Sequence, residues 1–517
     1  MARFKLTPLA KKLVFGVVAV GIVGGLVAGG VFSKASQDMK NIFKGKTEDE
    51  MYAQAGAINK EEGVINISLD EWIGWKSIID ANGGLTTQKG SIYDELGLKV
   101  NISVINDATQ SSNALIKGDL NAAGYTVNRY AFLYNKFKEN NVATKMAFVT
   151  NSSNGGDGII AKKDIKSIED LVGKKIGVPR YSEAQTLVEW LLQKSSLTDA
   201  QVQEIRNNMV LFDTPDDCAK AFFAGELDAA ATWQPYLDQA KSLGDSHVLF
   251  DTTNATNIIL DGLVFREDFI NNNRETVSKL LEGALKAESI YTTDATAISN
   301  TFPMFATQSA EDTLAMTSDA ALYNCASNIS ALSDNGAAVS LFRDMSVIWN
   351  TLGESADPNN ATKAFDVSIA KDLEDKFPNE TVIRPSFTEE QKQTAKEQSN
   401  DEALLTQRLS ITFETNSASI SPESYSALNE FIKTASILDG TIIQIEGNTD
   451  STGDAAYNTA LSEKRARSVA MYLQAQGLDS SRFIVVGNGP SNPIADNNTP
   501  EGQAANRRTD VYFKVVK

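Results

Sequence analysis

The sequence predicts an α/β protein with two similar lobes, a smaller β-α-β-α-β sandwich domain after them, and one N-terminal transmembrane helix. Three observations predict this fold class. The chain has 517 residues, which is too many for one hydrophobic core. From residue 64 onward, strand-like and helix-like stretches alternate, which is typical of a mostly parallel sheet covered by helices. Near the N-terminus, a long apolar run contains no charged residue.

Composition narrows the classes of function. The net charge of −18 and the pI of about 4.7 argue against nucleic acid as a partner, because phosphate binding needs a basic surface. The only histidine is His247, so carboxylates, aromatics, amides and arginines remain for chemistry. That inventory favours binding over catalysis, and we expect no enzyme activity, no metal and no cofactor. Cys218 and Cys325 lie far apart in the sequence, and we expect two buried thiols rather than a disulfide.

The N-terminal residues indicate where in the cell the protein is located. Residues 1–12 carry four basic residues and no acidic one, and residues 13–32 are uncharged. At about 1.5 Å per residue, such a helix is long enough for a hydrocarbon core of about 30 Å. We expect a cytoplasmic tail, a single-pass anchor in the inner membrane, a polar tether over 33–63, and the bulk of the chain in the periplasm. A cleaved signal peptide is the alternative, with a weak cleavage site in SKASQD.

A repeated unit predicts the two lobes. LIKGDLNAAGYT (115–126) and FFAGELDAAATW (222–233) share the pattern Gly-acid-Leu-Asn/Asp-Ala-Ala. In each copy a helix ends at a glycine, Gly118 or Gly225, which can adopt the left-handed conformation of a helix cap. Two copies of one unit indicate two α/β lobes within residues 64–385, and the cleft between such lobes is the expected small-molecule site.

Further motifs carry a family resemblance. In chain order they are the W-x-G-W loop (Trp72–Trp75), the two repeated units, SIEDLVGKKIGVPRYSEAQTLVEWLL (167–192), ATWQPYL (231–237) and GLVFREDFI (262–270). By their order and spacing, the region 64–385 resembles the periplasmic substrate-binding proteins of nitrate/sulfonate/taurine-type ABC importers. The resemblance implies a two-lobe periplasmic-binding-protein fold, a small anionic solute and an ABC permease as partner.

The residues expected to bind the solute share a position at the end of a strand or the start of a helix: Trp72, Trp75, Asp157, Ser182, Trp233 and Asp261. The tryptophans, Ser182 and Asp157 also have a purely structural interpretation. Tryptophan is an ordinary packing residue. Ser182 starts a helix whose free N–H groups favour anions, but Ser182 and Gln185 also form a capping box that needs no ligand. Asp157 lies among glycines, where it can simply support a turn.

The C-terminal part has a different pattern. Residues 386–403 are rich in Glu, Gln, Lys and Ser, which indicates a linker or a solvated helix. Residues 404–517 then predict a compact α/β sandwich, with helices over 422–438 and 459–476 and strands over 441–447, 483–487 and 509–515. In the last strand, alternation puts Val511, Phe513 and Val515 on one face.

Within this domain, Arg465 occupies an unusual position. Helical spacing places it on the same face as Leu461, Val469 and Tyr472. A guanidinium group on an apolar stripe needs an anionic partner, and the nearest upstream candidate is Asp450. The two residues are expected to form either a structural ion pair or the two halves of a site for a ligand that carries both an ammonium and a carboxylate.

A second family resemblance supports the ligand. ITFETNSASI, EGNTDSTGDAAYNTALSEKRARSVAMYL, GNGPSNPIADN and ANRR (505–508) follow one another over 404–517. In this order they resemble the peptidoglycan-binding domain of the outer-membrane protein A-like (OmpA-like) family. The resemblance implies that Asp450 binds the ammonium and Arg465 the carboxylate of diaminopimelate in peptidoglycan, with Thr449 and Asn458 in the same loop-to-helix segment. One position departs from the family pattern, because Asn448 replaces its usual histidine.

These expectations combine into one leading hypothesis, a membrane-anchored solute-binding protein that is tethered to the cell wall. The alternative is a structural or sensory envelope protein in which the binding fold serves signalling or wall attachment. A stator-like role is disfavoured, since residues 13–32 contain no carboxylate that could carry a proton. An enzyme of thiamine-precursor synthesis is disfavoured too, because that variant of the fold relies on a histidine and only His247 is present.

Overall fold

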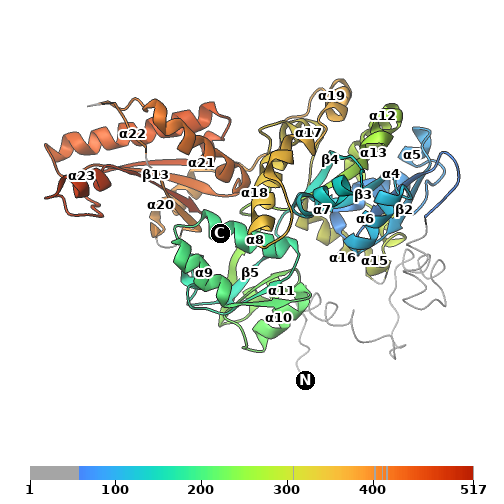
Figure 1. Ribbon diagram of the computed structural model, residues 1–517, viewed down its shortest axis with the longest axis horizontal. Helices are drawn as coiled ribbons and strands as arrows, with labels where there is room; N and C mark the ends of the chain where they lie inside the picture. Colours follow the sequence, from blue (N-terminus) through green and yellow to red (C-terminus); the bar gives the residue numbers. More distant parts are fainter. Residues whose placement is uncertain (1–57, 307, 401–402, 410, 415–416, 516–517) are drawn as a thin grey trace. The chain divides into compact units, whose positions relative to one another are not determined.

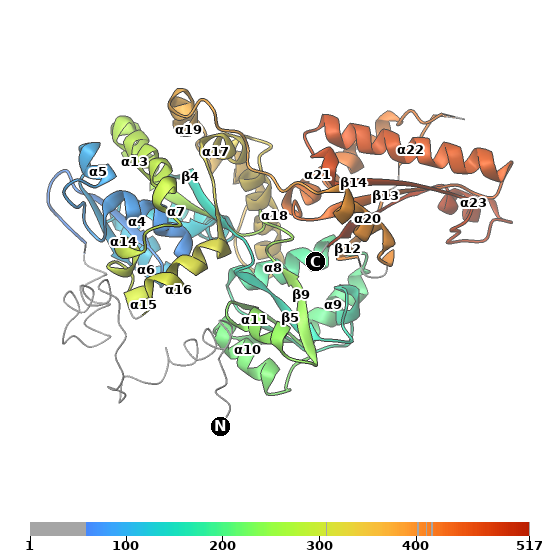
Figure 2. The same cartoon turned by 180° about the vertical axis from the view of Figure 1, so that it is seen from behind.

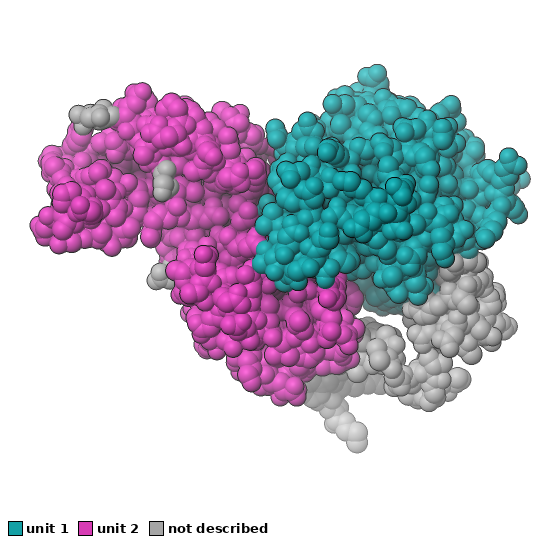
Figure 3. All heavy atoms as spheres, viewed as in Figure 1, with its two compact units in different colours: residues 1–156, 258–383 teal, residues 157–257, 384–517 magenta. Residues whose placement is uncertain are grey.

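The computed structural model describes residues 58–517 except 307, 401–402, 410, 415–416 and 516–517. It divides into unit 1, residues 1–156 with 258–383, and unit 2, residues 157–257 with 384–517 (Figure 3). The chain therefore passes between the units after Gly156, after Asn257 and after Ile383.

The predicted single-pass location in the inner membrane needs correction. Among the residues that the structure describes, no helix is both long enough and apolar enough to cross a membrane. The predicted tail at 1–12 and the predicted span at 13–32 lie outside the described residues, as does most of the predicted tether at 33–63.

Unit 1 contains a six-stranded sheet in the order β11-β4-β10-β3-β1-β2. Its strands are β1 (Ile65–Leu69), β2 (Val100–Val104), β3 (Ala122–Thr126), β4 (Thr144–Ser153), β10 (Leu260–Arg266) and β11 (Ala320–Leu322). β1 runs parallel to β2 and β3, whereas β10 runs antiparallel to β3 and β4, and β11 antiparallel to β4. The carboxyl ends of β1, β2 and β3 therefore meet at one edge of the sheet, next to the start of β10. The prediction of a mostly parallel sheet is wrong for this unit, because the chain returns through β10 from lobe two in the opposite direction.

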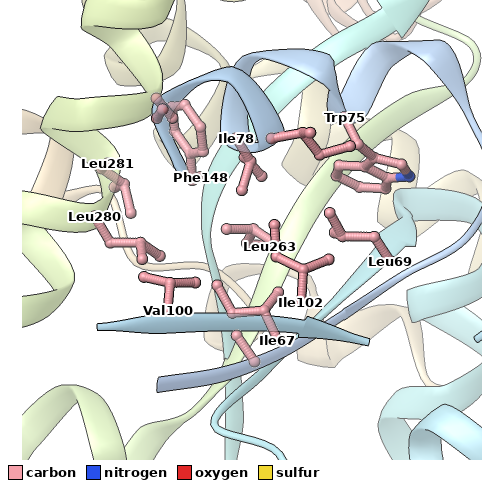
Figure 4. Close-up of a cluster of buried hydrophobic side chains, with 14 of the residues drawn as sticks. Ile67, Leu69, Trp75, Ile78, Val100, Ile102, Phe148, Leu263, Leu280 and Leu281 are labelled. Carbon is pink, nitrogen blue, oxygen red and sulfur yellow. The ribbon is translucent and has the colours of Figure 1, made fainter. Parts of the chain in front are cut away.

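Helices cover this sheet (Figures 1 and 2). They are α4 (Lys76–Asn82), α5 (Ile92–Glu95), α6 (Ala108–Lys117), α7 (Val127–Glu139), α12 (Glu267–Asn272), α13 (Arg274–Lys286), α14 (Thr296–Ser299), α15 (Pro303–Ala306), α16 (Ala310–Ala315), α17 (Cys325–Leu332), α18 (Ala337–Thr351) and α19 (Ser368–Leu373). The main hydrophobic core lies between strands β1 and β2 and helices α4 and α13, where Trp75, Ile78 and Leu280 gather (Figure 4). Burial of these large apolar side chains is the main force that holds the unit together.

The first part of unit 2, residues 157–257, is called lobe two here. Its five-stranded sheet has the order β7-β6-β8-β5-β9. The strands are β5 (Asp157–Lys162), β6 (Ile176–Pro179), β7 (Met209–Phe212), β8 (Ala229–Trp233) and β9 (Ser246–Asp251), and the helices are α8 (Glu183–Lys194), α9 (Asp199–Asn207), α10 (Pro215–Phe223) and α11 (Tyr236–Ser242). Gly118 in unit 1 and Gly225 in lobe two have φ angles of 81° and 80°, so both take the predicted left-handed conformation before strands β3 and β8.

The second part of unit 2, residues 384–517, is called the C-terminal domain here. Its four-stranded sheet has the order β12-β15-β13-β14. The elements are α20 (Glu389–Glu397), β12 (Leu405–Leu409), α21 (Tyr425–Ile437), β13 (Ile442–Asn448), α22 (Ala455–Ala475), β14 (Phe483–Gly489), α23 (Pro500–Asn506) and β15 (Thr509–Lys514). Helices α21 and α22 lie on one face of the sheet and α20 on the other (Figure 1). Val511 and Phe513 are both fully buried, as the alternation in the last strand predicts for one face.

The segment predicted as a linker or a solvated helix forms α20, and this helix packs on the C-terminal domain. Ala395 is fully buried against Ile442 and Ile484. The buried ammonium of Lys514 donates hydrogen bonds to the carbonyl oxygens of Ala395 and Gln398, both at 2.9 Å. These contacts explain why a segment with so few apolar side chains is nevertheless ordered against the sheet.

Candidate functional site

The Asp450 loop begins where strand β13 ends. Helix α22 lies close to that end, because Gly447 has no side chain: a Cβ there would lie 2.1 Å from the carbonyl oxygen of Ser462. The loop then runs to Asp454, whose carboxylate accepts a hydrogen bond from the backbone N–H of Tyr457 and caps α22. A strand, a short loop and a capped helix thus hold Asp450 in a defined place.

Asp450 forms an ion pair with Arg507, with 2.6 Å between Oδ2 and Nη1. Its other carboxylate oxygen accepts a hydrogen bond from the N–H of Thr452 at 2.9 Å. Burial raises the pKa of Asp450, but the hydrogen bonds from Arg507 and Thr452 and the charge of Arg507 outweigh burial, and the pKa lies below its ordinary value. Asp450 is therefore a carboxylate at neutral pH.

The structural alternative in which Asp450 pairs with Arg465 is wrong. Arg465 Nε instead donates to the carbonyl oxygen of Ser417 at 3.1 Å, and its guanidinium lies 4.9 Å from the centre of the Phe413 ring. Burial lowers the pKa of Arg465, and the nearby positive charge of Arg507 lowers it further. Arg465 is half-buried, and the negative charge of Asp450 partly opposes this lowering of its pKa.

Thr449 and Asn458 both fix the shape of the loop. Thr449 is 6% exposed, and its Oγ1 donates to the carbonyl oxygen of Asp450 at 2.8 Å. Asn458 is 7% exposed, and its Nδ2 donates to the carbonyl oxygen of Thr452 at 2.9 Å. In this structure both side chains therefore position the backbone around Asp450.

Asn448, which replaces the histidine of the resembled family, is buried on the sheet face opposite α22. Its Nδ2 donates to Asp510 Oδ2 at 3.3 Å, and its Oδ1 accepts from Asn488 Nδ2 at 3.1 Å. Its backbone N–H donates to the carbonyl oxygen of Arg508 at 2.9 Å. Asn448 thus joins the start of the loop to strands β14 and β15.

Taken together, the site presents one carboxylate paired with Arg507, and Arg465 lies on the helix that follows the Asp450 loop. Arg507 keeps 47% of its side chain exposed, while the Asp450 side chain is 12% exposed. Such a site can bind an ammonium group at the carboxylate and a carboxylate group at a guanidinium. Sequence reasoning missed Arg507, although it lies in the ANRR motif, because 57 residues separate it from Asp450. No group of residues suited to hold a metal ion occurs in the part of the chain that the structure describes.

Trp72, Trp75 and Asp261, three residues expected to bind solute, lie in unit 1. Trp72 is partly buried, and its Nε1 donates to Asn151 Oδ1 at 3.0 Å. Asp261 is 5% exposed and is paired in the sheet with Asn151 of β4 and Thr126 of β3. Trp75 has no exposed surface, and its Nε1 donates to Asp70 Oδ1 at 2.6 Å. In this structure Trp75 therefore packs in the core.

The other three expected residues lie in lobe two. Asp157 and Trp233 are direct partners in the antiparallel pairing of β5 with β8. Trp233 is 45% exposed, and its Nε1 donates to Asp216 Oδ1 at 2.9 Å. Ser182 caps α8: its Oγ accepts from the N–H of Gln185 at 3.2 Å.

Lobe two also shows an aromatic residue that sequence reasoning missed. Tyr181 precedes the cap at Ser182, is 57% exposed, and has a φ of 55°. Its backbone N–H donates to Gln185 Oε1 at 2.6 Å, and this bond helps to hold the left-handed conformation. Tyr181 follows β6, and Trp233 ends the parallel neighbour β8, so both lie at the carboxyl edge of these strands.

Both cysteines are free and buried, as predicted. Burial raises the pKa of the Cys218 thiol to about 12 and that of Cys325 to about 11. Since the thiolate is the reactive form, neither cysteine is suited to act as a nucleophile at neutral pH.

Comparison with known proteins identifies two family matches. Residues 83–294 match the model of the family described as NMT1/THI5 like, and residues 412–507 match the model of the OmpA family. The peptidoglycan-associated lipoprotein of Pseudomonas putida is 35% identical over 112 residues, which are 22% of this chain and 67% of that protein.

Other relatives are covered less completely. The peptidoglycan-binding protein ArfA of Mycobacterium tuberculosis is 41% identical over 101 residues, which are 20% of this chain and 31% of ArfA. The chain spans about half the length of two further relatives. Among solved structures, the periplasmic aliphatic sulphonate binding protein SsuA from Escherichia coli aligns at 15% identity with a TM-score of 0.45, over 60% of this chain and 100% of SsuA.

Proposed function

Because the chain belongs to the OmpA family by its C-terminal domain, and an NMT1/THI5-like substrate-binding domain precedes that domain, we propose that it binds peptidoglycan and a small solute in two separate domains. The C-terminal domain attaches the protein to the cell wall, and the two-lobe domain binds the solute. Both roles are binding roles, without a catalytic step.

One observation carries the cell-wall part of the proposal: Asp450, Arg507 and Arg465 together present one negative and two positive charges at a single loop. Diaminopimelate, the amino acid named by the family resemblance, offers an ammonium and a carboxylate on the same carbon atom. Asp450 binds the ammonium, and the arginines bind the carboxylate through charge-assisted hydrogen bonds. The names of the P. putida peptidoglycan-associated lipoprotein and of the peptidoglycan-binding protein ArfA support peptidoglycan as the polymer that this domain binds.

The solute-binding part of the proposal rests on the NMT1/THI5-like family match and on the position of the candidate residues at strand ends and helix starts. Trp72 and Asp261 in unit 1, and Asp157, Ser182 and Trp233 in lobe two, contribute to solute binding through side chains or backbone at strand ends and helix starts. Trp75 supports this region from the core. The solute is a small molecule that the protein delivers to an ABC permease, which agrees with the first family resemblance.

A pull-down on purified diaminopimelate-containing sacculi tests the wall-binding part. The full-length protein is compared with Asp450→Asn, Arg465→Ala and the control Arg467→Ala. Arg467 lies on the same helix but is 61% exposed and pairs with Glu463. Loss of one partner from a buried charge pair costs about 2–5 kcal/mol of binding, which is roughly a 30-fold loss of affinity or more.

We expect both site variants to lose sacculus binding and the control to keep it. Equal binding by all four proteins, with circular dichroism showing that the variants are folded, would contradict peptidoglycan binding at this site. A separate thermal-shift screen of small solutes tests the other domain, and it should find ligands whose effect is reduced in Trp72→Ala.

A further inference from the structure

The two parts of unit 2 meet at a turn of the C-terminal domain. This turn, residues 438–441, joins α21 to β13 and contacts the segment 252–257 at the end of lobe two. The carboxylate of Asp439 accepts hydrogen bonds from the N–H of Thr256 at 3.0 Å and from Thr256 Oγ1 at 2.8 Å. Beside it, Asn257 Nδ2 donates to the carbonyl oxygen of Ser436 at 2.8 Å.

The contact is close enough to require a glycine. A Cβ on Gly440 would lie 2.0 Å from the carbonyl oxygen of Thr253 and 2.9 Å from Asn254 Cα. Both neighbours are backbone atoms, so neither can move aside as a flexible side chain would. The turn and the segment therefore pack backbone against backbone.

A buried arginine holds the turn in shape. Arg482 is 3% exposed and donates to the carbonyl oxygens of Ala435, Leu438 and Thr441 at 2.8, 2.6 and 2.9 Å. These groups lie at the carboxyl end of α21, where carbonyl oxygens lack partners within the helix and a positive charge is favoured. Arg482 thus holds the turn by hydrogen bonds from within the C-terminal domain itself.

The segment on which the turn docks has a special place in the chain. It follows β9 and ends at Asn257, where the chain leaves unit 2 for unit 1. It also touches a second of the three crossings, because the N–H of Thr252 donates to the carbonyl oxygen of Asp157 at 3.0 Å, and Asp157 is the first residue of unit 2 after Gly156. Asp157 is in turn the sheet partner of Trp233.

We infer that this contact couples attachment to the cell wall with solute binding. Periplasmic binding proteins close around their ligands by bending at a few hinge residues, and the crossing segments are where such bending must occur in a two-lobe chain. Because the C-terminal domain hydrogen-bonds to the crossing segment 252–257, it stabilises some conformations of that segment over others. The coupling is reciprocal, so that wall binding changes solute affinity and solute binding changes wall affinity by the same factor. This inference rests on the proposed function of both domains.

Hydrogen–deuterium exchange of the full-length protein tests the contact itself. Asp439→Ala removes the acceptor for the Thr256 N–H, and Gly440→Ala inserts a methyl group into the contact. The matched control is Gly244→Ala in lobe two, where a Cβ meets no atom within 4 Å. Loss of a hydrogen bond to a charged group should speed exchange in the peptide covering 252–257 by about 10- to 100-fold in the first two variants. The control should exchange at the wild-type rate.

A second measurement, made with a soluble diaminopimelate-containing muropeptide, tests the coupling. The muropeptide should slow exchange in the loop 449–454 of all four proteins, and should slow exchange in 252–257 only in the wild type and in Gly244→Ala. Slower exchange at 449–454 with no change at 252–257 in the wild type would overturn the coupling while wall binding stands. No slowing at either segment would overturn both the proposed function and the inference built on it.

Discussion

Arg507 Nη1 lies 2.6 Å from Asp450 Oδ2, although the two residues are 57 positions apart in the chain. The pair joins the loop after β13 to the residue that follows α23. It also leaves Arg465, the nearer arginine in sequence, to donate to a backbone carbonyl oxygen of Ser417. The candidate wall site is therefore built by three segments of the C-terminal domain rather than by one strand–loop–helix unit.

Replacement of Arg507 should weaken sacculus binding less than loss of Asp450 does. Arg507 is 47% exposed, so water screens its charge, and we expect Arg507→Ala to lose about tenfold in affinity. Arg507→Lys should retain part of the affinity, because a point charge remains without the planar fork of donors. Binding isotherms on sacculi measure both. A larger loss for Arg507→Ala than for Asp450→Asn would contradict the proposed arrangement.

The free energy of unfolding should depend on pH through Asp450. The folded-state pKa is lowered below the ordinary value of 3.8, so the carboxylate contributes stability above about pH 4, and this contribution is lost as the pH falls through the folded-state pKa. Urea titrations of the wild type and Asp450→Asn, from pH 7 downward, should show that the wild type is more stable at pH 7 and that the difference shrinks below about pH 4. A difference independent of pH would show that the ion pair does not persist in solution.

Gly447→Ala should destabilise the C-terminal domain. The new methyl group would lie 2.1 Å from the carbonyl oxygen of Ser462, a backbone atom of α22, and the helix must move away from β13. Overpacking of this kind costs about 1–3 kcal/mol of unfolding free energy. Denaturant unfolding measures the loss, with Gly244→Ala as a control of equal chemistry in open space. Because Gly447 lies three residues before Asp450, sacculus binding should fall as well.

Substitution of two tryptophans in the solute-binding fold should have different effects, one on the stability of the fold and the other on solute binding. Trp75 has no exposed surface, and Trp75→Ala should cost about 3–5 kcal/mol of unfolding free energy. Trp233 is 45% exposed, and Trp233→Ala should leave the unfolding free energy nearly unchanged while reducing the thermal shift produced by a bound solute. Unchanged thermal shifts in Trp233→Ala, for every solute that stabilises the wild type, would remove Trp233 from the proposed binding residues.

Local spacing predicted several individual features of the fold, but not the strand directions, because the sheets are mixed rather than mostly parallel. The repeated Gly-acid-Leu unit predicted that a helix, a left-handed glycine and a short strand recur, and both copies have this form. The alternation in the last strand placed Val511 and Phe513 on one buried face. Periods of 3.6 and 2 residues are local properties of the backbone, so they can be detected in the sequence without knowledge of the fold. The loop carrying Asp450 was found in the same way, between a strand and a capped helix.

Only the tertiary structure decided which charges meet. Arg465 and Asp450 are 15 residues apart and share one motif, yet Asp450 pairs with Arg507 because β15 runs antiparallel beside β13 and brings the ANRR segment to the Asp450 loop. The same limit explains Trp75, whose ring is buried over Gly124 of β3 beside Leu69 of β1, and Gly440, whose role depends on a segment of lobe two. Such contacts join residues that are distant along the chain, and the spacing of side chains within one element contains no information about which distant element will lie beside it.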